Sequence, residues 1–376
     1  LVPMLVPAVH AGDVERAEKM GLDAFIEEQL YPEKIDDAEM DKMLARFPSL
    51  TMSSAQLMEN YPQPRPQPAP TASATPSQTP TPSATRDPRA TPTPAPTPTP
   101  RAKGVGDLIA ALQMATLLRA IYSRRQLYEM MVDFWTNHFS IYIAKDQVKW
   151  FKTVDDREVV RRHALGKFKE MLLASAHSPA MLDYLDNRVS VKGKPNENYA
   201  REVMELHTLG VDGGYTYADI QNVARAFTGW TIGGARQGFG YVFDARNHDN
   251  EAKAVLGVQI PAGGGEKDGL QVVDILAKHP ATAEFLAVRL TRRFVADAPP
   301  ASLIKRVAET YTKTDGDIRQ MMAVMLRSEE FKQSFGLKVK RPLEFLVSAI
   351  RALNVKVTED LPLLGSALTN LGQPLF

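Results

Sequence analysis

The most chemically suggestive side chain in this sequence is a carboxylate within an apolar helical pattern. Helical spacing in residues 196–210 places four apolar side chains on one face: Tyr199, Val203, Leu206 and Leu209. Glu202 falls within that face rather than opposite it. Because burial of an unpaired carboxylate is costly, we expect Glu202 to have a metal ion, an arginine or a hydrogen-bond donor as partner.

Two histidine segments could complete a site around Glu202. His138 lies on the apolar side of a predicted helix, where an imidazole is expected to be buried and neutral. His248 and Asp249 follow a strand-like stretch, so a loop could direct both into a cleft. Imidazole nitrogens and carboxylate oxygens together suit zinc, iron or manganese. The sequence therefore predicts a divalent metal held by His138, Glu202, His248 and Asp249, and the alternative is a buried hydrogen-bonded network of the same residues.

The remaining polar residues of residues 196–210 have a simpler interpretation. Glu197, Arg201 and Glu205 are four residues apart, which is the spacing of an ion-pair ladder on a solvated helix face. His207 is placed beside the apolar face and away from Glu202. We expect the ladder at the surface and His207 at the edge of the core.

Several classes of site are excluded by what the sequence lacks. There is no cysteine, so thiolate metal sites, disulfides and cysteine nucleophiles are excluded. No Gly-x-Ser-x-Gly elbow, His-Glu-x-x-His motif or phosphate-binding Gly-Lys-Ser/Thr loop occurs. Lys plus Arg number 45 against 44 for Asp plus Glu, so nothing in the overall charge indicates nucleic-acid binding. No run of eighteen apolar residues indicates a transmembrane segment.

The elements that must position these residues are mainly helices. Apolar side chains recur with helical period through most of the 376 residues. The predicted helices span residues 13–30, 36–47, 105–122, 124–142, 167–177, 179–185, 197–209, 218–230, 269–278, 281–295, 302–311, 318–326 and 342–353. The one strand pattern is the alternation at 239–243, and 255–258 is its predicted hairpin partner. The expected fold is a mainly α, multi-helix globular domain with a short β-hairpin.

A change in composition divides the chain into three parts. Residues 62–100 contain 14 of the 27 prolines, interleaved with Thr, Ser, Ala and Gln. Repeated Thr-Pro favours an extended polyproline conformation and cannot form a core. We therefore predict an N-terminal helical segment of the main domain at 1–61, a long disordered Pro/Thr-rich insertion at 62–103, and the main helical domain at 104–376.

Several long stretches of the sequence resemble a bacterial family, the domain-of-unknown-function 1800 family. The stretches that carry the resemblance are 134–139 (Phe-Trp-Thr-Asn-His-Phe), 178–187, 196–210, 226–230 (Ala-Phe-Thr-Gly-Trp), and His248-Asp249 with Lys253 and Leu256-Gly257. The resemblance implies an exported, largely helical protein in an extracellular or periplasmic setting. It also implies a partner, because such proteins are often encoded beside a second family with sulfatase-like features. The family pattern continues beyond Phe376, so we expect the sequence to be truncated at its C-terminus.

Two functional hypotheses follow from the sequence. One is a metal-dependent hydrolase, in which the bound ion lowers the pKa of a water to about 7 and so creates a nucleophile. The other is a non-catalytic scaffold or partner-binding protein of the cell envelope, acting with the sulfatase-like neighbour. The first requires His138, Glu202 and His248 to converge on one point, whereas the second requires each to be bonded to protein groups.

Overall fold

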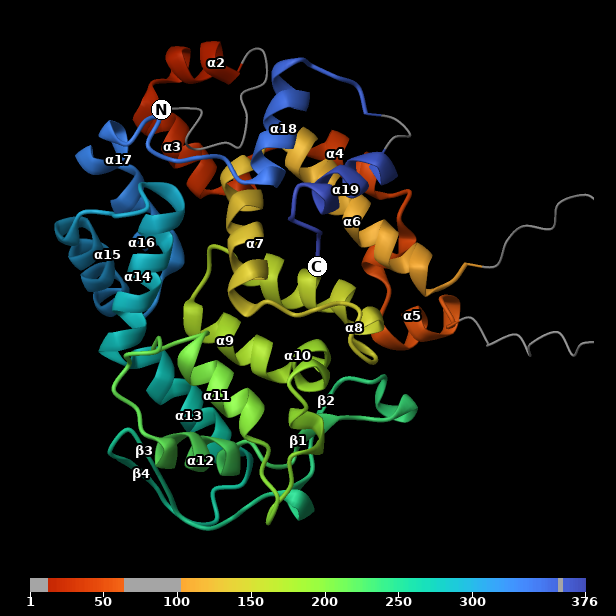
Figure 1. The fold of residues 1–376 in the computed structure, drawn as a ribbon, viewed down its shortest axis with the longest axis vertical. Coiled ribbons are helices and arrows are strands. Elements are labelled where there is room, and N and C mark those ends of the chain that lie inside the picture. The colour runs from red at the N-terminus through yellow and green to blue at the C-terminus, as the bar shows by residue number, and fades with distance from the viewer. Residues whose placement is uncertain (1–12, 64–102, 358–360) are drawn as a thin grey trace, which may run out of the picture.

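The computed structural model describes residues 13–63, 103–357 and 361–376, and it is mainly helical, as predicted (Figure 1). The predicted Pro/Thr-rich insertion falls almost entirely on residues 64–102, which lie outside the described residues. Most predicted helices are present, with ends shifted by a few residues. The structure also contains helices that periodicity did not predict, at 54–60, 148–161, 329–333 and 361–370.

Four short N-terminal helices pack against the longer helices that follow. They are α2 (Asp13–Met20), α3 (Leu22–Leu30), α4 (Ala38–Leu44) and α5 (Ser54–Asn60). The single helix predicted for 13–30 is interrupted at Gly21, whose φ of 85° a β-carbon would disfavour. Helix α3 contacts α7 and α16, α4 contacts α6, and α5 contacts α8. The N-terminal segment therefore shares the core of the rest of the molecule.

The long central helices build the frame of the molecule. These are α6 (Val105–Tyr122), α7 (Gln126–Phe139) and α8 (Val148–Asp155), the last continuing directly into a π-helix, η3 (Asp156–Arg161). A π-helix inserts a residue into the helical turn and is frequent at functional sites. Helix α6 packs against α18 and α19, and in Figure 1 α8 crosses below α6 and α7.

The remaining helices complete two further groups. One group contains α9 (Phe168–His177), α10 (Pro179–Tyr184), α11 (Glu197–Glu205), α12 (Tyr217–Ala226) and α13 (Glu266–Lys278). The other contains α14 (Pro280–Phe294), α15 (Ala301–Lys313), α16 (Ile318–Leu326), α17 (Glu329–Gln333), α18 (Pro342–Ala352) and α19 (Leu361–Asn370). Short 3-10 turns occur at Pro32–Lys34, Pro48–Thr51, Asn187–Val189, Ala235–Gln237 and Ala245–Asn247. In Figure 1 the first group lies in the lower half of the molecule with the strands, and α14–α17 lie along one side.

Two short antiparallel hairpins replace the single predicted one. Strand β2 (Tyr241–Phe243) pairs with β1 (Trp230–Ile232), and β3 (Lys253–Val255) pairs with β4 (Val258–Ile260). The predicted pairing of 239–243 with 255–258 is therefore wrong. Leu256 and Gly257 both have positive φ, 51° and 78°, which is the geometry of a two-residue hairpin turn. Because that turn pairs Val255 with Val258, the strand Tyr241–Phe243 pairs with β1, which begins at Trp230.

One described helix is long and apolar enough to cross a membrane by length and composition alone. It is α6, which contains Asp107 and Arg119. Its side chains Leu112, Leu117 and Leu118 are buried in the protein core, and it packs against α4, α8, α18 and α19. One third of the helix, 33%, is buried within the described part of the protein.

Candidate functional site

His138 is buried, and its hydrogen bond goes to the backbone rather than to a ligand set. Its Nε2 lies 3.0 Å from the carbonyl oxygen of His207, so Nε2 carries the proton and donates. Burial, with a further contribution from nearby Arg289, holds the pKa of His138 well below its ordinary value. The imidazole is therefore neutral, as the sequence predicted, in a cage of rings that includes Trp135 and Phe139.

Glu202 is less buried than the helical projection predicted. Helix α11 ends at Glu205, and Leu206, which should share the buried face, is 43% exposed. Glu202 is only partly buried. Burial and then the neighbouring Glu205 raise the pKa of Glu202.

The residue next to His138 is His207, whose ring centre lies 6.1 Å from that of His138. Burial lowers the pKa of His207 to about 3, so it too is neutral.

His248 is completely buried, and both of its ring nitrogens face protein oxygens. Nδ1 lies 2.8 Å from the carbonyl oxygen of Thr228, and Nε2 lies 3.2 Å from Asp268 Oδ2. Lys253 Nζ donates to the same Asp268 oxygen at 2.7 Å and to the carbonyl oxygen of Glu251 at 2.8 Å. These bonds fasten the loop and the β3–β4 hairpin onto α13.

Asp249 forms a two-point ion pair with an arginine. Arg225 Nε lies 2.8 Å from Asp249 Oδ2, and Arg225 Nη2 lies 3.2 Å from Oδ1. This guanidinium holds the pKa of Asp249 below its usual value. Within the described ranges, no group of three or more His, Asp or Glu side chains is placed to hold a metal ion. The structure therefore brings His248 and Asp249 to adjacent protein partners and does not assemble them with His138 and Glu202 into one ligand set.

The expected charge ladder is present in part. Arg201 and Glu197 form an i, i+4 pair at 3.7 Å with 46% and 30% of their side chains exposed. Glu205 lies 3.5 Å from the hydroxyl of Tyr215 instead of pairing with Arg201. Pairs this exposed contribute only about 0.3 to 0.5 kcal/mol.

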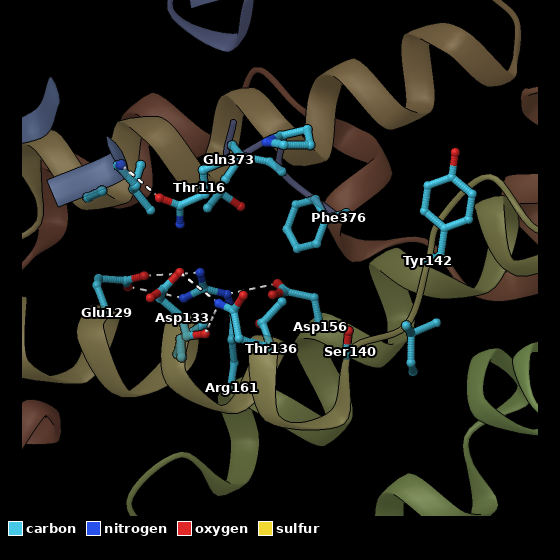
Figure 2. Close-up of a pocket in the computed structure, with 17 residues that line it drawn as sticks. Thr116, Glu129, Asp133, Thr136, Ser140, Tyr142, Asp156, Arg161, Gln373 and Phe376 are labelled. Carbon is cyan, nitrogen blue, oxygen red and sulfur yellow. Dashed lines mark hydrogen bonds and ion pairs between the residues drawn. The ribbon is translucent and has the colours of Figure 1, made fainter. Parts of the chain in front are cut away.

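A different set of residues forms a pocket with polar side chains in its lining. The cavity, about 220 Å³ in volume, lies between α7, α6, η3 and residues 373–376. Figure 2 shows Thr116, Gln373 and Phe376 facing Glu129, Arg161 and Thr136 across it. The amide oxygen of Gln373 accepts from the Leu343 backbone at 3.0 Å, which fixes the C-terminal residues in place.

The floor of the pocket is a buried ion-pair network centred on Arg161. Its Nη1 and Nη2 each lie 3.0 Å from an oxygen of Glu129, and its Nε lies 2.8 Å from Asp156 Oδ2. The side chains of Arg161 and Glu129 are 10% exposed and that of Asp156 is 4% exposed. These two carboxylates act against the effect of burial and raise the pKa of Arg161. Burial raises the pKa of Tyr128, whose hydroxyl donates to the Arg161 carbonyl at 2.7 Å, to about 12.

A second set of ion pairs extends the network toward α14 and α18. Asp133 pairs with Arg293 at 3.4 Å and with Arg341, and Arg293 also pairs with Glu344. Each carboxylate that lines the pocket, namely Glu129, Asp133 and Asp156, is thus bonded to an arginine.

Free hydroxyls complete the wall. Thr136 and Ser140 both line the cavity, and neither hydroxyl forms a hydrogen bond with another described residue; Thr136 is partly buried and Ser140 is exposed. Ser140 ends α7 in a left-handed conformation, with φ 44°. Tyr142 and Phe376 add aromatic surface. The pocket thus offers hydroxyl groups and ring faces above a charge-neutralised floor.

Part of this pocket was visible in the sequence. The helical projection of residues 124–142 already places Glu129, Asp133 and Asn137 together on the polar side, opposite His138. The missing signal is the segment 148–161, because periodicity predicts no helix there, whereas the structure has a continuous helical segment. Without that helix, nothing placed Asp156 and Arg161 opposite Glu129.

With this geometry established, comparison with known proteins places the chain. Residues 8–376 match the family described as "Protein of unknown function (DUF1800)". The chain belongs to this family. The match spans the N-terminal helices and the main helical part alike, which confirms the resemblance carried by the sequence stretches. No curated protein and no solved structure matches the chain.

Proposed function

We propose that this DUF1800 protein is a non-catalytic binding protein that takes a small neutral hydroxylated molecule, such as one sugar unit, in the pocket between α6, α7 and η3. The observation that carries the proposal is the pair of unpartnered hydroxyls, Thr136 and Ser140, in a cavity of about 220 Å³. A ligand with several hydroxyl groups can both donate to and accept from them.

The charge arrangement supports a neutral ligand. Because Glu129, Asp133 and Asp156 are all bonded to arginines, none is left to require a cationic ligand. Arg161 has its three donor nitrogens directed at carboxylates, so it does not require an anionic one. Tyr142 and Phe376 offer the apolar faces against which the C–H surface of a sugar ring packs.

The arrangement of the four residues proposed from the sequence favours binding over metal-dependent hydrolysis. His138, His248 and Asp249 are bonded to protein groups, and Glu202 is partly exposed. For His138, His248 and Asp249, these contacts support the alternative in which the residues form structural hydrogen bonds. A metal-dependent hydrolase stays a prediction from the sequence that these contacts do not favour.

The test is a binding measurement with a shape-matched variant. Neutral sugars, with glucuronate and glucosamine as charged comparisons, would be titrated into the protein by calorimetry. Thr136→Val keeps the shape of the side chain and removes its hydroxyl, so the affinity for the neutral sugar should fall about 5- to 10-fold, as expected for one lost hydrogen bond. Thr312→Val, on the exposed side of α15, is the control.

Two outcomes would contradict the proposal. One is that no neutral sugar binds, and the other is that Thr136→Val binds it as tightly as the wild type. Zinc, iron and manganese analysis of the purified protein, with His138→Ala for comparison, tests the hydrolase alternative on the same samples.

We also propose an extracellular or periplasmic location and a sulfatase-like partner, which the family resemblance and the Pro/Thr-rich segment support. Cell fractionation of the tagged protein tests the location. Co-purification with the neighbouring gene product tests the partner, and recovery of the protein alone in the cytoplasmic fraction would contradict both.

A further inference from the structure

A second cavity adjoins the same ion-pair network. It is about 310 Å³ in volume and lies between the N-terminal residues 41–51 and the helices α6, α8 and η3. It shares Asp156 and Arg161 with the first pocket, but its other polar lining residues are Arg119, Arg157, Thr51, Thr153 and Asp41. The N-terminal segment thus closes a polar space against the central helices.

Arg119 has an unmet hydrogen-bonding requirement in this cavity. Its Nη1 is buried and, among the described residues, has no hydrogen-bond partner. The carboxylate oxygen with which it is ion-paired, Asp156 Oδ2, is 4.0 Å away. That oxygen already accepts a hydrogen bond of 2.8 Å from Arg161 Nε. A buried donor is costly when it is left without an acceptor.

The charge of Arg119 is also poorly compensated. Burial, and then the positive charge of Arg161, lower the pKa of Arg119. Glu129 and Asp156 are both engaged by Arg161 through hydrogen bonds of 2.8 to 3.0 Å. The cavity therefore holds a guanidinium whose Nη1 has no hydrogen-bond acceptor among the described residues and whose ion-pair partner, Asp156, is 4.0 Å away.

The rest of the cavity suits a small anion. Arg157 is fixed in the wall because its Nη1 donates to the carbonyl oxygens of Leu50 and Met52. Thr153 places a hydroxyl-bearing side chain in the lining, whereas the Thr51 hydroxyl donates to the Pro48 carbonyl oxygen at 3.1 Å. A planar guanidinium matches the oxygens of carboxylate and phosphate groups in both geometry and charge.

We propose that this cavity binds an oxyanion, a single carboxylate or phosphate group, with Arg119 as its principal ligand and Arg157 beside it. The acceptor oxygen of the anion meets Arg119 Nη1, and its negative charge offsets that of Arg119, whereas Arg157 is already paired with Glu158 at 2.8 Å. This site differs from the first pocket in the class of ligand that we propose for it and in its principal residue, Arg119, which does not line the first pocket.

The test uses inorganic phosphate, acetate and chloride at matched ionic strength on the full chain. An anion that binds only the folded protein stabilises it by RT ln(1 + [L]/Kd), so the midpoint temperature of unfolding rises as the anion concentration increases. Phosphate or acetate should raise the midpoint more than chloride does, and the anion that acts identifies the oxyanion class. Arg119→Met should lose this response. Arg292→Met, which removes an exposed arginine of α14 outside the cavity, should keep it.

A second variant keeps the test decisive if Arg119→Met does not fold. Asp41 is exposed on α4 and lines the cavity, so Asp41→Asn removes a negative charge without disturbing a buried contact. The affinity for phosphate or acetate, measured by calorimetry, should then rise about 2- to 5-fold. Three outcomes would overturn the proposal. Chloride could raise the midpoint temperature of the wild type as much as phosphate and acetate do, or Arg119→Met could keep the full rise with phosphate or acetate. The third is that Asp41→Asn binds these anions with unchanged affinity. None of these outcomes depends on whether a sugar binds the first pocket.

Discussion

Arg161 is the residue on which the candidate site depends most. Its guanidinium bonds two nearly buried carboxylates, those of Glu129 and Asp156. Breaking a buried ion pair by removing one partner costs more than the pair contributes, because the remaining charge is left buried without compensation. The same side chain therefore supports both the floor of the first pocket and the wall of the second.

Arg161→Met should lower the free energy of unfolding by about 3 to 5 kcal/mol. The neighbouring Arg162→Met is a matched control, because Arg162 is 68% exposed and should change stability by no more than about 0.5 kcal/mol. Urea denaturation of both variants measures the difference. Adding Glu129→Gln to Arg161→Met should cost less than the sum of the single changes, since it removes one unpaired charge. Equal losses in the two arginine variants would show that the network does not stabilise the fold.

For single residues, the sequence predicted the burial of His138 better than it predicted the burial or the bonding partners of the other candidate residues. It correctly predicts that His138 is a buried, neutral imidazole. It assigned Glu202 to a buried face because the helical projection assumed that the helix continues to 209, whereas α11 ends at Glu205. The partner of Asp249 in the structure is Arg225, which lies 24 positions earlier in the sequence. No local pattern reveals such a non-local pair.

Among the elements, α13 shows how one small residue sets a packing distance. A β-carbon added to Gly269 would lie 2.3 Å from the Trp230 ring, and Trp230 is fully buried. The absence of a side chain at 269 therefore lets the first residue of β1 pack directly on the helix. Periodicity predicted the helix at 269–278 but could not show this contact, because Trp230 comes from a separate segment.

Gly269→Ala should lower the free energy of unfolding by about 1 to 3 kcal/mol, because the added methyl group overpacks the core. Intrinsic helix propensity alone predicts the opposite sign, since alanine favours a helix by about 1 kcal/mol over glycine. Gly106→Ala in α6 isolates that propensity, because no atom lies within 4 Å of its added β-carbon. It should raise stability by about 0.5 to 1 kcal/mol. Stabilisation by both changes in urea denaturation would show that Trp230 does not restrict position 269.

Across the whole molecule, the two described parts on either side of the Pro/Thr-rich segment form one structure. Asp37 accepts hydrogen bonds from the Ser123 hydroxyl at 2.6 Å and the Arg124 backbone at 3.0 Å. Trp150 Nε1 donates to the Tyr61 carbonyl at 2.9 Å. Residues 41–51 also form one side of the proposed anion cavity. The composition of the sequence predicted where the chain divides. Composition could not show why the first part belongs to the core, and these contacts give the reason.

The ends of that segment meet in space, so it should be removable without loss of the fold. A β-carbon on Gly104 would lie 3.7 Å from the Pro62 carbonyl oxygen. Replacing residues 64–102 by a short Gly-Ser linker should leave the free energy of unfolding unchanged or raise it by up to about 1.5 kcal/mol, since closing a shorter flexible loop costs less entropy.

A chain that begins at residue 62 is the contrasting variant. It should fail to unfold cooperatively, because it lacks the buried side chains of Phe25, Ile26, Leu30 and Leu57. Urea denaturation followed by circular dichroism compares the two. If the linker variant loses its cooperative transition, the segment contributes to the fold. If the chain from residue 62 keeps its transition, the N-terminal helices are a dispensable addition, and the anion cavity that they help to form cannot be an integral part of the molecule.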